Sequence, residues 1–81
     1  MMITVYSASW CAFCHAAMEY LDKLNVKYEV KDIESDKSIA EEAIEKSGQM
    51  GIPVIDIKGD IIVGFDRPKI DDTLRKHEIT S

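Results

Sequence analysis

The two cysteines of this 81-residue chain, Cys11 and Cys14, stand three residues apart between a strand pattern and a helix pattern. Residues 2–6 form a short apolar run, which is typical of a strand. Residues 12–24 carry apolar side chains at spacings of three and four, which predicts an amphipathic helix with Phe13 at its start. A cysteine at such a turn lies near free backbone N–H groups and the positive end of the helix dipole. The pattern therefore predicts dithiol–disulfide chemistry at a strand-to-helix turn.

The middle of the chain predicts a second strand and a second helix. Residues 26–31 alternate apolar and charged side chains, which predicts an edge strand with one face in water. A helix is predicted over 36–47, capped by Ser35 or Asp36 and ended by Gly48. The apolar side of this helix comprises Ile39, Ala40, Ala43 and Ile44.

The last part of the chain predicts a hairpin and a closing helix. The strands 54–57 and 61–63 are separated by a short turn that contains a glycine. A helix over 67–77 follows, with Pro68 in its first turn and Asp66 available as its cap. The predicted order is therefore βαβαββα.

Composition narrows the class of protein and its partners. The length predicts one domain, 1–81, and the 46% of hydrophobic residues are enough for a small core. Fifteen acidic residues against ten basic ones give a net charge of −5, without a basic cluster, so nucleic acid and anionic membranes are not expected as partners. Because the chain opens directly into a strand and has no long apolar run, we expect a cytoplasmic protein. In that reducing compartment a close cysteine pair is typical of catalysis or metal binding.

The whole chain resembles the thioredoxin fold in its short glutaredoxin form. The resemblance rests on the element order, on C-x-x-C after the first strand, and on the Ile52–Pro53 step before the third strand. Residues 6–14 are similar to the glutaredoxin active-site segment, 48–53 to the segment that ends in the cis-proline, and 63–66 to the glycine-pair segment. The resemblance implies an α/β domain with a four-stranded mixed sheet and three flanking helices.

The cysteine pair is the candidate catalytic site. We expect Cys11 to be the exposed nucleophile, with a pKa lowered to roughly 3.5–7.5. Cys14, one turn into the helix, is expected to be shielded and to resolve the mixed disulfide. An unreactive buried pair is the alternative without chemistry. A zinc site would have only His15 as a third ligand, on another side of the helix, so no metal is predicted.

The string 11–15 also has the form C-x-x-C-H, which attaches c-type haem. Haem attachment takes place outside the cytoplasm, and the predicted hairpin is a poor match to a small helical cytochrome. We therefore rank haem well below the redox interpretation.

Four residues around the pair are candidates for substrate binding. The resemblance implies that Ile52 and Pro53 pack across from Cys11, and that the Ile52 backbone pairs with an incoming chain or glutathione. A proline that merely begins a strand is the alternative. Trp10 offers an apolar platform for protein substrates or lies partly in the core. Phe13 belongs either to the core stripe or to the substrate contact.

Residues 64–68 carry the evidence on the subfamily. Glutathione-using glutaredoxins have a glycine pair here, but this chain has Gly64 followed by Phe65. Asp66 either binds an amino group of a ligand or caps the helix. Phe65 followed by Arg67-Pro68 resembles the glycine-phenylalanine-arginine-proline run of NrdH-type redoxins, with Asp66 as an extra residue. Those redoxins take electrons from thioredoxin reductase and pass them to ribonucleotide reductase.

Other departures favour the same subfamily. Ala8 and Met50 stand where glutaredoxins commonly carry basic contacts to glutathione, and Ala12 replaces the usual proline. Val5 stands where thioredoxins place a buried acid, so the accessory residues of neither glutaredoxins nor thioredoxins are complete. The loss of two charged hydrogen bonds weakens glutathione binding by roughly 1–3 kcal/mol each.

The sequence thus predicts a dithiol–disulfide oxidoreductase that reduces protein disulfides, as a monomer with no tightly bound cofactor. Its reductant is thioredoxin reductase or glutathione as a co-substrate, and we favour the former. A glutathione-dependent glutaredoxin that deglutathionylates proteins is one alternative. A dimer that binds an iron–sulfur cluster through Cys11 and glutathione is another.

Overall fold

The computed structural model describes residues 3–79, which form four strands and three helices. The elements are β1 (Ile3–Ser7), α1 (Ala12–Lys23), β2 (Glu29–Asp32), α2 (Lys37–Ser47), β3 (Val54–Ile57), β4 (Asp60–Val63) and α3 (Arg67–Lys76). The predicted βαβαββα order is confirmed. Met2, which the prediction placed in the first strand, lies outside the described residues.

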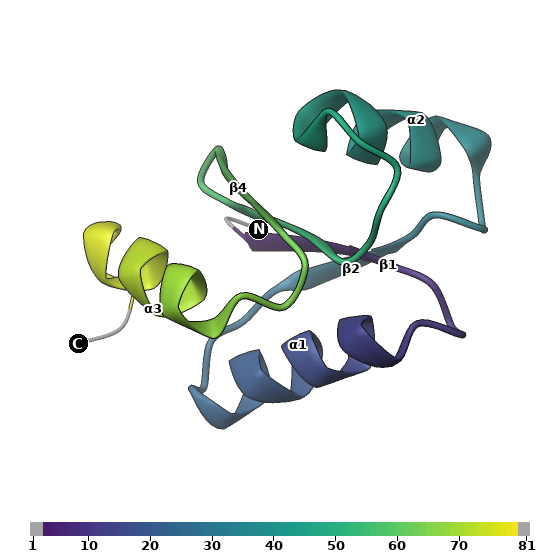
Figure 1. Cartoon of the computed structure of the whole chain (residues 1–81). Helices are drawn as coiled ribbons and strands as arrows, with labels where there is room; N and C mark the ends of the chain where they lie inside the picture. The colour runs from purple at the N-terminus through teal and green to yellow at the C-terminus, as the bar shows by residue number, and fades with distance from the viewer. Residues whose placement is uncertain (1–2, 80–81) are drawn as a thin grey trace.

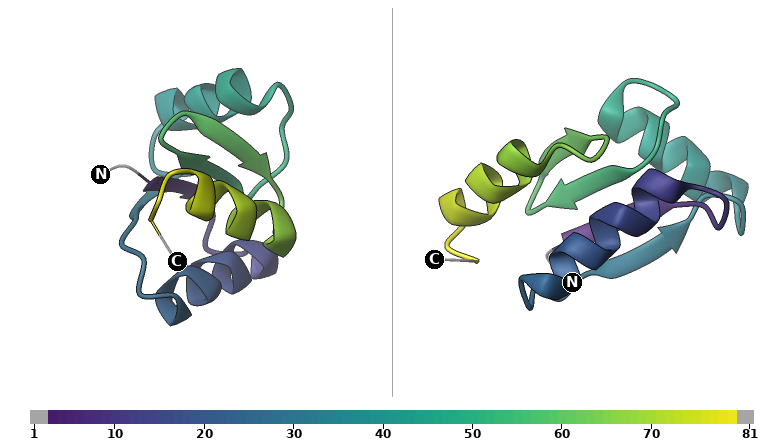
Figure 2. Two further views of the ribbon diagram at one scale, coloured as in Figure 1. Left: turned by 90° about the vertical axis from the view of Figure 1, so that its left-hand side faces the viewer. Right: turned by 60° about the horizontal axis from the view of Figure 1, so that its bottom comes forward.

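The four strands form one mixed sheet in the order β2-β1-β3-β4. Strand β1 pairs with β2 in parallel and with β3 antiparallel, and β3 pairs antiparallel with β4. In Figure 1, α1 lies below the sheet and α2 above it. The views of Figure 2 show α3 on the same side as α1. The predicted mixed sheet with helices on both faces is therefore confirmed.

Alternation along the strands divides the core between the two faces of the sheet. On the face of α1 and α3 lies one aliphatic cluster, which includes Ile3, Val5, Ala17, Leu21, Ile55, Ile57, Ile62, Ile70 and Leu74. On the face of α2 lies a smaller cluster of Tyr6, Ala43 and Val54, with partly buried neighbours. Most of the apolar burial is therefore on the side of α1 and α3.

Strand β2 begins three residues later than predicted. Helix α1 is followed by Asn25 in the left-handed conformation, with φ of 58°. The Val26 N–H donates to the carbonyl of Leu21, 3.1 Å away. Val26 therefore belongs to the end of the helix. The alternation of apolar and charged residues around it led to its prediction as part of the strand. The edge position of β2 is as predicted.

Helix α2 has the predicted caps but buries less than predicted. The Asp36 carboxylate accepts from the Ser38 N–H at 2.9 Å, and Gly48 ends the helix with φ of 73°. Of the predicted apolar side only Ala43 is buried, and Ile44 is 38% exposed. Ile39 and Ala40 are half-buried, so this side of α2 lies partly in water.

The hairpin and α3 follow the prediction closely. Lys58 and Gly59 both have positive φ and connect β3 directly to β4, as in a two-residue hairpin. The Asp66 carboxylate accepts from the Lys69 N–H and caps α3. Pro68 lies in the first turn, where a missing N–H costs nothing. Within residues 3–79, every helix is too short or too polar to cross a bilayer.

Candidate active site

The two cysteines are brought together at the start of α1, where they form a disulfide. Cys11 is the residue that caps α1, and its Sγ accepts a hydrogen bond from the Cys14 N–H at 3.1 Å. A sulfur that caps a helix receives both a direct N–H donor and the positive end of the helix dipole. The same geometry stabilises a Cys11 thiolate once the disulfide is opened.

Burial differs between the two cysteines less than the sequence suggested. Cys14 is fully buried, as predicted, whereas Cys11 retains only 6% of its surface instead of being openly exposed. Both lie in a cluster with Ala8, against which Met18, Ile33 and Ile52 pack. These apolar neighbours and the bond to Cys14 cover Cys11 in this disulfide form. The order of access still favours Cys11 as the attacking sulfur, a role that remains a prediction.

The Ile52–Pro53 peptide bond is cis, as the resemblance implied. Ile52 is half-buried against the cysteine cluster, and Pro53 is buried beside it. The Pro53 carbonyl accepts from the Gly64 N–H at 2.8 Å, next to the Val54–Val63 pair of the β3–β4 hairpin. The structure therefore joins three predicted positions into one unit: the cysteine turn, the cis-proline and the residue that begins the 64–66 segment.

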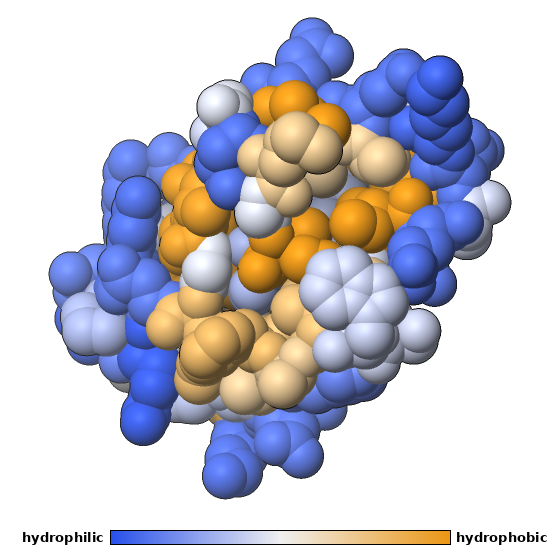
Figure 3. Space-filling view, turned by 45° about the vertical axis from the view of Figure 1, so that its right-hand side comes forward, coloured by the Kyte–Doolittle hydropathy of each residue, from blue (hydrophilic) through white to orange (hydrophobic). Residues whose placement is uncertain are grey.

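Large apolar side chains around the turn point into solvent. Trp10 is 67% exposed, Phe13 69% and Met50 82%. The assignment of Phe13 to the core stripe is thus wrong: Ala17 and Leu21, at the same spacing, are buried in the main core, whereas Phe13, in the first turn of α1, is exposed. Figure 3 shows apolar side chains gathered into one patch on this side of the molecule, hollowed at its centre and bordered by hydrophilic residues. Exposed apolar surface of this kind is typical of an interaction site.

The 64–66 segment is held by side-chain packing. The rings of Phe65 and Tyr20 meet edge to face, with centroids 5.9 Å apart, and Arg67 lies over the Tyr20 ring at 4.8 Å. A hydrogen bond from the Tyr20 hydroxyl to Asp71 is the main reason why the pKa of Tyr20 is raised. Phe65 therefore fills the space that a second glycine would leave open. The sequence analysis identified its neighbour Tyr20 only as part of the apolar stripe of the first helix.

Two of the predicted site residues have a described structural role as well. Asp66, which was left open between ligand binding and capping, caps α3. Gly64 takes a φ of 81°, which favours glycine, at the point where it contacts Pro53. Neither role excludes contact with a ligand, because the Asp66 side chain remains exposed.

The position where thioredoxins place a buried acid is occupied by Val5, which is fully buried in the main core. Over residues 3–79, no three histidine, cysteine, aspartate or glutamate side chains converge as metal ligands. The arrangement can therefore store two electrons in its sulfurs, switching between a dithiol and a disulfide.

Comparison with known proteins agrees with this geometry. The family model described as glutaredoxin matches residues 3–62. An uncharacterized glutaredoxin-like 8.6 kDa protein from the rubredoxin operon of Clostridium pasteurianum is 39% identical over 93% of this chain and 100% of its own length.

Two solved structures share the fold. Glutaredoxin from Archaeoglobus fulgidus has a TM-score of 0.85 and 24% identity, over 91% of this chain and 86% of its own. The glutaredoxin-like NrdH-redoxin from Escherichia coli has a TM-score of 0.78 and 25% identity, over 89% of this chain and 93% of its own. The thioredoxin fold that the resemblance implied is thereby confirmed.

Proposed function

This chain belongs to the glutaredoxin family of thiol–disulfide oxidoreductases, and we propose that it is a redoxin that reduces protein disulfides with electrons from a thioredoxin-reductase-type flavoenzyme. The acceptor that we propose is the disulfide of a ribonucleotide reductase, by the resemblance of residues 64–68 to NrdH-type redoxins. The reaction needs no tightly bound cofactor, since Cys11 and Cys14 carry the two electrons.

The proposed reaction has two exchange steps. In the first, the Cys11 thiolate attacks one sulfur of the substrate disulfide and forms a mixed disulfide, and the other substrate sulfur leaves as a thiolate. In the second, the Cys14 thiolate attacks Cys11 Sγ and releases the second substrate thiolate. The two leaving thiolates take up the two protons lost by the cysteines. The product is the Cys11–Cys14 disulfide, which the reductase opens with two electrons.

The packing of Phe65 is the observation that supports this electron source. Phe65 lies against Tyr20, and Arg67 lies over the same ring, so the position of the second glycine of glutathione-using glutaredoxins is filled by a fixed aromatic side chain. Of the two positions where a basic contact is common, Ala8 is buried and Met50 extends into solvent. The E. coli NrdH-redoxin, a glutaredoxin-like protein with a thioredoxin-like activity profile, agrees with this proposal.

The test compares the two reductants on one preparation of oxidised protein. NADPH consumption is followed with thioredoxin reductase alone, and separately with glutathione plus glutathione reductase. We expect rapid turnover only with thioredoxin reductase. Turnover only with glutathione would contradict the proposal and would support a glutathione-dependent glutaredoxin.

Two variants test whether Phe65 is the cause of low turnover with glutathione. Phe65→Gly restores the second glycine and is expected to raise turnover with glutathione several-fold, because the backbone can then be approached. Met50→Ala, an exposed apolar side chain outside the 64–66 segment, serves as the control and should leave glutathione turnover low. Cys14→Ser should stall as a mixed disulfide with the protein substrate, which gel mobility under non-reducing conditions detects.

A further inference from the structure

The segment between β1 and Cys11 is held by few contacts, although it presents the active-site sulfur. Ser9 and Trp10 are both exposed. The Cys11 N–H donates to the Ala8 carbonyl at 3.1 Å, and this hydrogen bond spans Ser9 and Trp10 without binding either of them. Of the side-chain hydrogen bonds described over residues 3–79, one reaches this segment, and it comes from His15.

His15 lies in the first turn of α1, four residues after Cys11. Helical side chains lean toward the N-terminus, so the imidazole extends back over the turn that contains Cys11. Its Nε2 is 3.0 Å from the Ser9 carbonyl oxygen. A carbonyl oxygen only accepts, so Nε2 carries the proton and donates, in the neutral ring and in the imidazolium alike. The backbone of His15 is bound to the same turn, because its N–H donates to the Cys11 carbonyl at 3.2 Å.

We propose that His15 is a positioning residue, which ties the Ser9–Trp10 segment to α1 and so fixes Cys11 Sγ beside the Cys14 N–H. The hydrogen bond to Ser9 closes a loop that contains both cysteines. Within that loop Cys11 Sγ accepts from the Cys14 N–H at 3.1 Å, the contact that stabilises the thiolate. Without this tether, the hydrogen bond from His15 to Ser9, the Ser9–Trp10 segment moves more freely. The hydrogen bond from the Cys14 N–H to Cys11 Sγ is then formed for less of the time, and the pKa of Cys11 rises. This inference rests on the proposed function, because it assigns a role within the same cysteine site.

The pKa of Cys11 also depends on the ionisable side chains near this turn. The ionisable neighbours are Glu19, one turn further along α1, and Asp32 and Glu34, which flank the residue whose N–H bonds to the Ser7 carbonyl. The segment from Gln49 to Pro53 brings no ionisable side chain. A charged His15 would add to the stabilisation of the thiolate, so the test must separate the hydrogen bond from the charge.

Two variants make that separation. His15→Gln keeps a side-chain N–H donor of similar reach without a titrating ring, and His15→Ala removes both the donor and the charge. Glu19→Ala, an exposed change on the same helix, is the matched control. Thiolate absorbance of the reduced protein is followed against pH to obtain the pKa of Cys11, and circular dichroism confirms folding of each variant.

We expect His15→Ala to raise the pKa of Cys11 by roughly half a unit, an approximately threefold loss of thiolate below that pKa. His15→Gln and Glu19→Ala should stay close to the parent protein. A pKa in His15→Ala equal to that of the parent would overturn the inference. An equal rise in His15→Gln would also overturn it, because charge rather than the tether would then be responsible. The titration uses no reductase or substrate, so failure of the proposed electron source leaves its outcome unaffected.

Discussion

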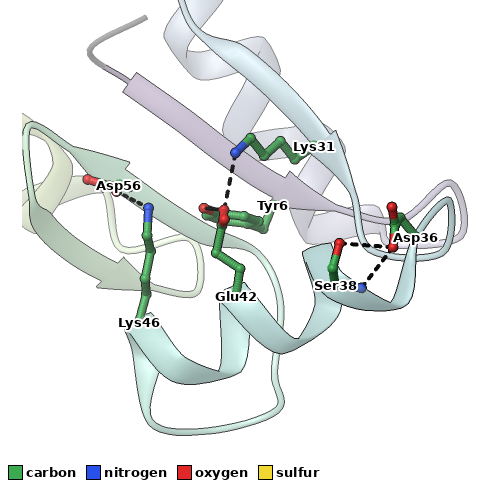
Figure 4. A network of polar contacts seen from close by, with 7 residues as sticks. All are labelled: Tyr6, Lys31, Asp36, Ser38, Glu42, Lys46 and Asp56. Atoms are coloured by element: carbon green, nitrogen blue, oxygen red, sulfur yellow. Dashed lines mark hydrogen bonds and ion pairs between the residues drawn. The ribbon is translucent and has the colours of Figure 1, made fainter.

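The two faces of the sheet are built by different means. The face covered by α1 and α3 is aliphatic, and its members, such as Ile55 and Leu74, are fully buried. The face covered by α2 is centred on a buried tyrosine surrounded by charged side chains (Figure 4). Tyr6 donates to Glu42, which also pairs with Lys31 at 3.1 Å. The first face therefore depends on apolar area and the second on a polar network.

The network on the α2 face is internally matched. Lys46 pairs with Asp56 at 2.6 Å and also lies over the Tyr6 ring, 5.4 Å from its centroid. The hydrogen bond to Asp56 is the main reason why the pKa of Lys46 is raised. Burial, and then the hydrogen bond to Glu42, raise the pKa of Tyr6. Each charge thus has a partner, as a partly buried charge requires.

The difference teaches how a short helix can be attached where little apolar area exists. Helix α2 buries one side chain fully, so its orientation is set by directional contacts from Glu42 and Lys46 to the sheet. The aliphatic face carries the larger share of the stability and supports α1, the helix that holds the cysteines. We expect substitutions on the two faces to differ in size accordingly.

The largest effect should come from removing a central aliphatic side chain. Ile55→Ala leaves a cavity between β3 and the two helices on its face, which costs about 2–5 kcal/mol. Urea unfolding measures the change, with Ile55→Val as a milder variant expected to cost about 0.5–1.5 kcal/mol. A loss below about 1 kcal/mol in Ile55→Ala would break the comparison, because the aliphatic face would then not be dominant.

A smaller effect is expected at the centre of the other face. Tyr6→Phe keeps the buried ring but removes the hydroxyl that donates to Glu42, at a cost of about 1 kcal/mol. A double-mutant cycle with Glu42→Ala, which removes the acceptor, measures the coupling of the pair by urea unfolding. Additive effects of the two substitutions would show that the hydrogen bond contributes nothing to the attachment of α2.

The pH dependence of stability should also separate the faces. Hydrogen bonds from Tyr6 and Lys31 hold the pKa of Glu42 below its ordinary value of 4.5. Because folding lowers the pKa of Glu42, its ionised carboxylate stabilises the folded state. This stabilisation is complete above pH 4.5 and is lost as the pH falls through the pKa that Glu42 has in the folded protein. Glu42→Gln should therefore flatten the acid side of the stability curve.

The matched control for the acid limb is Glu41→Gln, an exposed change of the same charge on the neighbouring residue. The thermal unfolding midpoint is measured from pH 7 to pH 3 for the parent protein, Glu42→Gln and Glu41→Gln. If Glu42→Gln and the parent lose the same stability as the pH falls, the acid sensitivity comes from groups outside the α2 face.

The smallest effect is expected at the cap of α2. Asp36→Ala removes the acceptor of the Ser38 N–H and loosens the first turn of α2, where Ile39 is only partly buried. Hydrogen exchange of the first-turn amides should accelerate while the unfolding midpoint changes little. Asp66→Ala, the corresponding change at α3, should disturb its helix less, because Ile70 and Leu74 anchor α3 in the main core.

Local patterns were enough to predict the elements and their order. Helix caps at Asp36 and Asp66, the left-handed Gly48, and the hairpin between β3 and β4 depend on residues close in the sequence. Two predictions failed for different reasons. Val26 looked like part of a strand because it alternates with charged neighbours, but its N–H bonds to Leu21 at the end of α1. Phe13 has the spacing of the buried Ala17 and Leu21, but it lies in the first turn of α1 and is exposed, because spacing does not show how far along a helix the core extends.

The candidate site was predictable in its residues but not in its contacts. The motif and the resemblance identified Cys11, Cys14, Ile52, Pro53 and Gly64. That Tyr20 contacts both Phe65 and Arg67 depends on α1 meeting the start of α3, and these elements are far apart in the sequence. No local signal specifies such pairs, because many side chains could satisfy the same pattern.

The sequence by itself determined the chemistry and the family of this protein, since a C-x-x-C pair at a strand-to-helix turn and the element order need only local information. The tertiary structure alone decided how the site is supported. It covers Cys11 to 6% exposure, places Phe65 against Tyr20, and brings the His15 ring to the Ser9 carbonyl. The physical reason is that burial and hydrogen bonding depend on which groups meet once the chain is packed, and packing is a property of the whole fold.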